Sequence, residues 1–406
     1  MKRATRRGFL TSVGLAGAGL GLRPAVAPAA PVGTAARAGA VSFFGPHQAG
    51  IATPTQEHVQ FAGLDLLSSS ADDLRGLLAL LSGAAADLCA GRPVGALQTG
   101  ETPPVDTGEA VGLSAARLTV TFGLGPSIFA PGRFGLAPRR PAPLVDLPAF
   151  ANDALEDAIS GGDLALQVCA EDPQVAFHAV HDLIRLAQPL VTVRWLLAGF
   201  GRTSNSRRQQ TPRNLMGFKD GTANIVSEDT ASLSRFVWAN GPESPPWMQG
   251  GSYMVVRRIK MLLDRWDGIG LNQQEDTFGR HKLSGAPLGE AHEYDPLDLR
   301  ARRDGRPVIP FDAHVRLASP AENSGQRILR RGYSYVEPIE GPADAVAGGQ
   351  LFICYQRDPR RQFIPIQRRL AASDALNAHT AHVGSAIFAC PPGIGPGGYV
   401  GQPLLG

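Results

Sequence analysis

The sequence GFKDGTANI, residues 217–225, holds one acidic side chain, Asp220, between two glycines in the middle of a long chain. An Asp followed by a Gly most often accepts hydrogen bonds from its own backbone in a turn. Alternatively, Gly217 and Gly221 allow the backbone to lie close against a flat ligand, with the Asp220 carboxylate aimed at that ligand. The stretch alone supports both interpretations, so its meaning depends on what the rest of the chain supplies.

A candidate metal ligand, His314, lies farther along in IPFDAHVRL, residues 309–317, a short apolar and polar alternation that ends in a loop. A lone histidine is more often structural than a ligand. A single neutral imidazole from a loop is nevertheless what a five-coordinate haem iron requires, with the opposite face left open for a small molecule. The chain contains no Cys-x-x-Cys-His motif, which predicts that such a haem would be bound noncovalently.

Two adjacent arginines, Arg330 and Arg331, precede a segment with the composition of a strand. They could be a pair of surface charges. On a strand, however, successive side chains point to opposite faces, so one guanidinium could enter a pocket while the other binds elsewhere. With Asp220 and His314, one such arginine would complete the carboxylate, imidazole and guanidinium that peroxide cleavage at a haem iron needs.

Length and composition indicate an ordinary globular protein. The chain has 406 residues, of which 43% are hydrophobic and 18% charged, and this length favours two domains or one large double domain. The 39 Lys and Arg residues exceed the 36 Asp and Glu residues, but residues 1–30 hold five of the basic ones and no acidic one. Without them the balance is 34 to 36, so no basic excess points to nucleic acid.

The first forty residues have the features of an export signal. A basic start is followed by TRRGFL at residues 5–10, an apolar Gly- and Ala-rich run at residues 10–22, and small residues through position 30. This pattern resembles a twin-arginine signal, which predicts export to the periplasm or the extracellular space. A membrane anchor is the weaker alternative, because the apolar run is shorter than the roughly 20 residues that span a bilayer. We therefore expect no integral membrane segment in the mature protein.

Four cysteines, widely separated in apolar surroundings, are expected to be buried free thiols rather than disulfides: Cys89, Cys169, Cys354 and Cys390. None has the spacing of a zinc site.

The hydrophobic pattern predicts an α+β fold with a duplicated unit. Strands are predicted at residues 59–66, 118–123, 164–169 and 192–198, with helices at residues 71–90 and 174–187. The second half gives a strand at residues 252–257, a helix at 258–268, and further regular segments at 334–336, 350–356 and 363–371. Residues 201–214 are interpreted as the linker between the halves. Residues 271–310 are too long for a plain connector and are predicted to be a functional loop packed over a site.

With these motifs the chain resembles the dye-decolorizing peroxidases of the exported deferrochelatase/peroxidase type. The resemblance runs from GPHQAGI at residues 45–51 to PPGIG at 391–395, through FGLGPS at 122–127, QVCAEDPQ at 167–174, WMQGGSY at 247–253, FGR at 278–280 and GAPL at 285–288. It implies a duplicated ferredoxin-like fold with antiparallel sheets and surrounding helices. The implied domains are residues 41–210 and a haem-binding domain at 211–406, with one noncovalent haem b per chain and a possible homodimer.

The resemblance also implies a role for individual residues. His314 matches the proximal iron ligand, Asp220 the distal acid–base, and Arg330 the distal arginine that stabilises developing charge. Gly221, Thr222 and Ala223 match the backbone that lies along the porphyrin. Arg280 matches a residue near the haem edge and propionates.

Two positions depart from the pattern of many relatives. Ala378 stands where an acidic residue usually partners the proximal imidazole, and His281 stands where one often follows the haem-edge arginine. Asp374 could substitute for the missing acid, or the imidazole could lack a charged partner.

The resemblance implies a haem peroxidase that reduces hydrogen peroxide and oxidises dyes, phenolics or similar one-electron donors. A carboxylate base favours an acidic activity optimum. Two alternatives stay open: a haem-handling protein that releases iron from haem, and an exported binding module without haem. Since bulky dyes cannot reach a buried haem, aromatic residues would relay electrons or simply pack in the core: Trp195, Trp238, Trp247, Trp266, Tyr333, Tyr335 and Tyr355.

Overall fold

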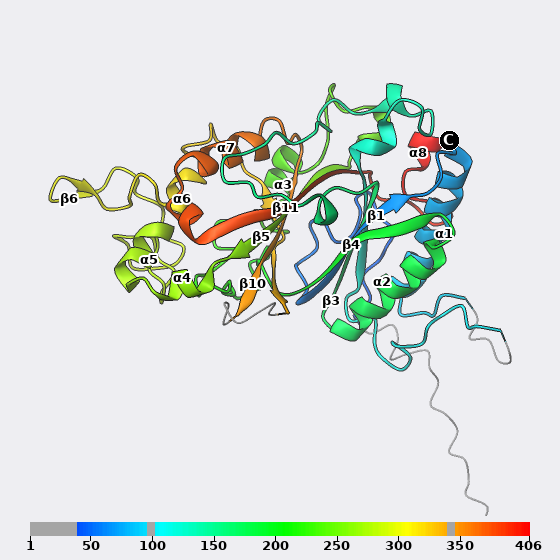
Figure 1. Ribbon diagram of the computed structural model, residues 1–406, viewed down its shortest axis with the longest axis horizontal. Helices are drawn as coiled ribbons and strands as arrows, with labels where there is room; N and C mark the ends of the chain where they lie inside the picture. The colour runs from blue at the N-terminus through cyan, green and yellow to red at the C-terminus, as the bar shows by residue number, and fades with distance from the viewer. Residues whose placement is uncertain (1–38, 96–101, 339–345) are drawn as a thin grey trace, which may run out of the picture. The chain divides into compact units, whose positions relative to one another are not determined.

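The N-terminal half of the chain is a β-α-β-β-α-β unit (Figure 1). This computed structural model describes residues 39–95, 102–338 and 346–406. The unit consists of β1 (His58–Leu66), α1 (Ala71–Cys89), β2 (Thr119–Leu124), β3 (Leu164–Ala170), α2 (Pro173–Ala187) and β4 (Val191–Arg202). Its antiparallel strands lie in the order β2-β3-β1-β4. Side chains cap the starts of both helices, Ser70 for α1 and Asp172 for α2, because they accept bonds from backbone N–H groups of the first turn.

The C-terminal half repeats this order. Its main elements are β5 (Ser252–Met261), β9 (Tyr333–Glu337), β10 (Ala347–Gln356), α7 (Phe363–Ser373) and β11 (Thr380–Cys390), with antiparallel strands in the order β11-β5-β10-β9. The first crossover is elaborated and holds α4 (Leu263–Asp267), α5 (Leu271–Phe278), the hairpin β6 (Arg302–Arg303) and β7 (Arg306–Pro307), and α6 (His314–Leu317). The remaining elements are α3 (Thr230–Phe236), β8 (Leu329–Arg330), α8 (Gln402–Leu405) and short 3₁₀ turns. The chain therefore has the predicted α+β class and duplicated ferredoxin-like fold.

The two four-stranded sheets join at both edges. On one side Ala389 of β11 pairs with Leu124 of β2, and on the other Phe200 of β4 pairs with Ser334 of β9. Strand pairing consequently runs in a closed circuit through both halves, and each edge strand of one half is covered by the other.

Alternate residues of these strands fill the interior of the circuit. One buried cluster takes every second residue from strands of both halves, for example Val59 and Phe61 of β1 and Leu351, Ile353 and Tyr355 of β10. A second cluster includes Ala62, Leu64 and Leu66 of β1 with the leucine-rich face of α1, and it continues into the second half through residues such as Phe363 of α7. The sheet is thus packed on both faces.

Three sequence predictions need correction. The predicted helix at residues 258–268 is wrong in its first part, because β5 continues to Met261 with ladder partners on both β10 and β11, and this pairing overrides local helix propensity. The predicted loop at residues 271–310 begins with a helix, α5. The linker at residues 201–214 connects the halves but is not a plain exposed segment: Thr203, Ser204, Asn205 and Ser206 are buried.

Other expectations meet the structure only in part. All four cysteines are free and buried, as predicted. Residues 1–38 of the predicted leader lie outside the described residues, and the domain division near residue 210 stays a prediction. Within the described ranges, no helix combines the length and the apolar character that crossing a membrane requires.

Candidate active site

All residues that the sequence singled out for chemistry line one cavity in the C-terminal half. They come from the loop that follows β4, the residues just after α5, the first residue of α6, and β8: Asp220, Gly221, Thr222, Ala223, Arg280, His314 and Arg330. Residues far apart in sequence therefore meet in one space.

His314 is held at one wall of the cavity by a buried carboxylate. Its Nδ1 lies 2.6 Å from Oδ2 of Asp374, a side chain that is only 3% exposed. Asp374 is fixed in turn, since its Oδ1 accepts a hydrogen bond from Leu376 N at 2.9 Å. An Nδ1–H that donates to a carboxylate leaves the Nε2 lone pair available to a metal ion and makes it more basic.

The His314 side chain lies deep in the protein but faces the open space of the cavity. It therefore keeps 36% of its surface exposed. Burial lowers the pKa of this imidazole, but the charge and hydrogen bond of Asp374 outweigh that effect and raise the pKa above its ordinary value. The partner is Asp374 and not position 378, where Ala378 uses its backbone oxygen to accept a bond from Arg265.

Asp220 is held at the cavity by three donors. Its Oδ1 accepts from Arg330 Nη1 at 2.5 Å, and its Oδ2 accepts from Gln350 Nε2 at 2.7 Å and Thr203 Oγ1 at 3.1 Å. These partners lie on other segments, so the carboxylate does more than close its own turn. The next residue must be glycine: Gly221 has φ +126°, and a Cβ there would lie 2.3 Å from Ser204 Oγ.

The two arginines point to different places, as the strand argument predicts. Arg330 lines the cavity, and its backbone is tied to the 217–225 stretch by Asn224, whose Oδ1 accepts from Arg330 N at 2.9 Å and whose Nδ2 donates to Arg330 O at 2.8 Å. Arg331 is fully buried and donates instead to Thr53 O at 2.6 Å and to the side chain of Gln56.

The rest of the cavity suits a flat apolar ring that carries carboxylates. Much of its lining is apolar: Met216, Ile259, Met261, Phe278, Val315, Ile328, Phe352, Ile366 and Leu370. Basic groups are present as well. Arg280 donates to the backbone oxygens of Gly285 and Glu293, at 2.7 and 3.0 Å, and burial lowers the pKa of its guanidinium. An available imidazole nitrogen, apolar walls and cations that can face carboxylates together fit a haem.

The sequence did not identify Thr203 and Gln350, whose bonds orient the Asp220 carboxylate, and it left the partner of His314 open, with Asp374 as one of two alternatives. His281 departs from the expected acid without touching the cavity, since its Nδ1 pairs with Glu275 Oε2 at 2.8 Å and it lines a separate hollow. The seven aromatic residues that were candidates for electron relay are all buried, with Trp195 and Trp238 the most exposed at 7%, which agrees with core packing.

Comparisons with known proteins cover nearly the whole chain. A Dyp-type peroxidase N-terminal model matches residues 48–201, and a Dyp-type peroxidase C-terminal model matches residues 211–395. A deferrochelatase from Escherichia coli strain K12 is 39% identical over 372 residues, 89% of this chain and 86% of that protein.

Solved structures give the same result. A DyP-type peroxidase from Cellulomonas bogoriensis has a TM-score of 0.81 and 43% identity, covering 90% of this chain and 98% of that one. Ferric DtpA from Streptomyces lividans has a TM-score of 0.83 and 40% identity, covering 93% of this chain and 100% of that one.

Proposed function

Since this chain belongs to the Dyp-type peroxidase family and is a haem-dependent peroxidase, we propose that His314, Asp220 and Arg330 divide the work of peroxide cleavage between them. The proposal rests on one observation: two ion pairs, His314 with Asp374 and Asp220 with Arg330, line the same cavity. His314 with Asp374 supplies a metal ligand, and Asp220 with Arg330 supplies an acid–base group beside a fixed cation.

The residues that would hold the haem follow from the cavity. Nε2 of His314 would ligate the iron, the backbone of Gly221, Thr222 and Ala223 would lie along the porphyrin, and Arg280 would face its carboxylates. When bound, haem b supplies the redox chemistry that passes electrons from a donor to peroxide.

Asp220 would move the proton that cleavage of hydrogen peroxide requires. As a base, its carboxylate would take a proton from one peroxide oxygen, and as an acid it would return that proton to the other oxygen, which leaves as water when the O–O bond breaks. Arg330 would neutralise the negative charge that develops on the departing oxygen. Thr203 and Gln350 act as positioning residues, because their bonds to Oδ2 fix the orientation of the carboxylate.

Arg330→Leu tests the charge-stabilising role directly. We expect the variant to keep its haem, since His314 is untouched, but to react with peroxide about 100-fold more slowly, as when one charge-stabilising donor is removed. Stopped-flow absorption in the Soret region measures this rate. A rate equal to that of the wild type would assign the charge stabilisation to another group.

Release of iron from haem is a second candidate activity, supported by the name deferrochelatase that the 39%-identical relative bears. Incubation of the protein with haem, followed by analysis for metal-free porphyrin, separates this activity from peroxidation of a dye. Because family membership assigns the chain to haem-dependent enzymes, the alternative of a binding module without haem falls away.

Export and assembly rest on the sequence. We propose that the twin arginines Arg6 and Arg7 direct folded, haem-loaded protein through the twin-arginine route to the periplasm or the extracellular space. Replacing both by lysine should leave the protein inside the cell, as cell fractionation would show. A homodimer is the proposed assembly, which sedimentation analysis can test.

A further inference from the structure

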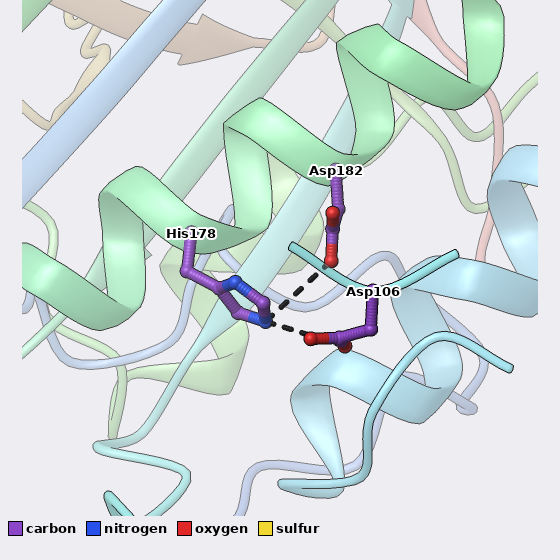
Figure 2. Close-up of side chains that lie close together, drawn as sticks. All are labelled: Asp106, His178 and Asp182. Carbon is purple, nitrogen blue, oxygen red and sulfur yellow. Dashed lines mark ion pairs between the residues drawn. The ribbon is translucent and has the colours of Figure 1, made fainter. Parts of the chain in front are cut away.

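A second group of ligand-type side chains lies in the N-terminal half, away from the cavity of His314. Figure 2 shows His178 and Asp182 projecting from α2 toward Asp106, in the segment between α1 and β2. His178 and Asp182 are four residues apart, so they share one face of the helix. All three side chains are buried, and their ligand atoms lie within 4.8 Å of one another.

The distances within this cluster fit a shared ion better than direct hydrogen bonds. His178 Nε2 lies 3.5 Å from Asp182 Oδ2 and 3.6 Å from Asp106 Oδ2. An N–H···O hydrogen bond is usually near 2.9 Å. Two ligands that are each about 2.1 Å from a tetrahedral ion are separated by about 3.4 Å. Both distances from His178 Nε2 therefore match the spacing of ligands around one small ion, and the ligand atoms of the two aspartates lie within 4.8 Å of each other.

Glu109 fixes the His178 ring in the form that binds a metal. Its Oε2 lies 2.8 Å from His178 Nδ1, and its Oε1 lies 2.7 Å from Nδ1 of His181. A carboxylate oxygen 2.8 Å from Nδ1 accepts the proton of that nitrogen, which leaves the Nε2 lone pair facing the two aspartates.

Asp182 gives a second, independent indication that this cluster binds a cation. The residue has no exposed surface, and its Oδ2 has no hydrogen-bond partner among the residues that the structure describes. Its Oδ1 is fully used, because it accepts from Thr107 N at 3.1 Å and Thr107 Oγ1 at 2.9 Å. A buried carboxylate oxygen without a donor is costly unless a cation faces it.

Asp106 is oriented by two backbone donors. Its Oδ1 accepts from Gly108 N and its Oδ2 from Val94 N, both at 2.8 Å, which orients the carboxylate and leaves capacity on Oδ2. Metal ligands bind in their deprotonated forms, so both carboxylates would carry a negative charge. Two such carboxylates and one neutral imidazole balance the charge of a divalent ion.

We propose that His178 Nε2, Asp106 Oδ2 and Asp182 Oδ2 bind one divalent ion of the zinc class, with water as the fourth ligand. An imidazole among the ligands favours zinc over magnesium or calcium. The ion ties the segment around Asp106 to α2, and none of its ligands lines the haem cavity.

Zinc binding to the haem-loaded full chain tests this site. After treatment with a chelator, protein mixed with excess Zn²⁺ and passed through gel filtration should retain one zinc per chain, counted separately from haem iron by mass spectrometry. His178→Ala and Asp182→Asn should abolish this retention. Glu109→Gln should weaken zinc affinity by about 10- to 100-fold, since it removes the partner that orients the imidazole.

His181→Ala is the matched control. His181 lies on the same helix and contacts the same Glu109, but its side chain is 43% exposed and it is not one of the three ligands. Its loss should change zinc affinity by less than about threefold, which is well below the effect expected for Glu109, the residue that orients the His178 ring. Retention of zinc by His178→Ala equal to that of the wild type would overturn the proposal.

A measurement on the wild type keeps the proposal testable if the variants do not fold. X-ray absorption at the zinc edge should show four nitrogen and oxygen ligands at about 2.0 to 2.2 Å, one of them an imidazole. Failure of the wild type to retain stoichiometric zinc, or zinc without an imidazole ligand, would mean that the cluster is a histidine–carboxylate ion pair only.

Discussion

Asp374 is the residue that we expect to determine how firmly His314, the proposed ligand, holds an iron. Its carboxylate lies 2.6 Å from Nδ1 of His314 and is almost fully buried. Asp374→Asn should lower haem affinity by about 10- to 100-fold, because an amide orients the imidazole without making it more basic. Titration of haem-free protein with haem, followed at the Soret band, measures the affinity.

Asp312→Asn is the control for this change. Asp312 is an exposed carboxylate two residues before His314, so its loss removes a similar charge without touching the ring. Equal haem affinities for the two variants would show that Asp374 does not support the ligand.

At the residue scale, the sequence points to the proposed reacting groups more clearly than to the groups that orient them. Asp220 and His314 stand in short stretches whose neighbours already suggest chemistry. Thr203 and Gln350 do not, because each looks like an ordinary polar residue until the fold brings it to Oδ2 of Asp220. The partner of His314 was uncertain for the same reason: Asp374 and Ala378 can be distinguished only by the path of the 3₁₀ turn that Asp374 caps.

At the element scale, Asp163 joins several segments of the N-terminal half. Its carboxylate accepts from Leu66 N at 2.8 Å, at the end of β1, and from Ser127 and Arg133. Burial raises the pKa of Asp163, but the bonds from Arg133, Ser127 and Leu66 outweigh it and hold the pKa below its usual value. Asp163→Asn should therefore lower the free energy of unfolding at pH 7 by about 2 kcal/mol.

The same pKa shift fixes the pH dependence of this effect. A lowered pKa in the folded state means that the stabilisation is complete above the ordinary aspartate pKa of about 4 and is lost as the pH falls through the folded value. Urea unfolding of wild type and Asp163→Asn at pH 7 and pH 3 measures the difference. The control Asp146→Asn, in an ion pair whose carboxylate is 80% exposed, should change stability by at most about 1 kcal/mol. A difference between wild type and Asp163→Asn that grows on acidification would contradict the assignment.

Element types were largely predictable from sequence, and the errors have a common cause. Residues 59–66 and 164–169 alternate or run apolar within clear turns, and both form strands. Residues 258–261 carry Arg258, Ile259 and Lys260, which suit a helix locally, but β10 and β11 supply ladder partners on both sides. Nothing in the local sequence reveals partners that lie about ninety or more residues away.

At the scale of the whole molecule, the closed circuit of strands predicts that the two halves unfold together. Each half covers an edge of the other, at β2 with β11 and at β4 with β9, and one buried cluster draws side chains from both halves. Calorimetry of the haem-free protein should show one transition whose calorimetric and van't Hoff enthalpies agree. Two separated transitions would show that the halves are independent folding units.

Asp220 is the residue that we propose moves the proton during peroxide cleavage, and Asp220→Asn removes that capacity while it keeps the size of the side chain. Haem-loaded wild type and variant, each mixed with one equivalent of hydrogen peroxide in a stopped-flow instrument, give the rate of the first Soret change. With haem content unchanged, we predict a rate at least about 100-fold lower in the variant, because an amide cannot accept and return the proton. A rate equal to that of the wild type would show that Asp220 does not move the proton.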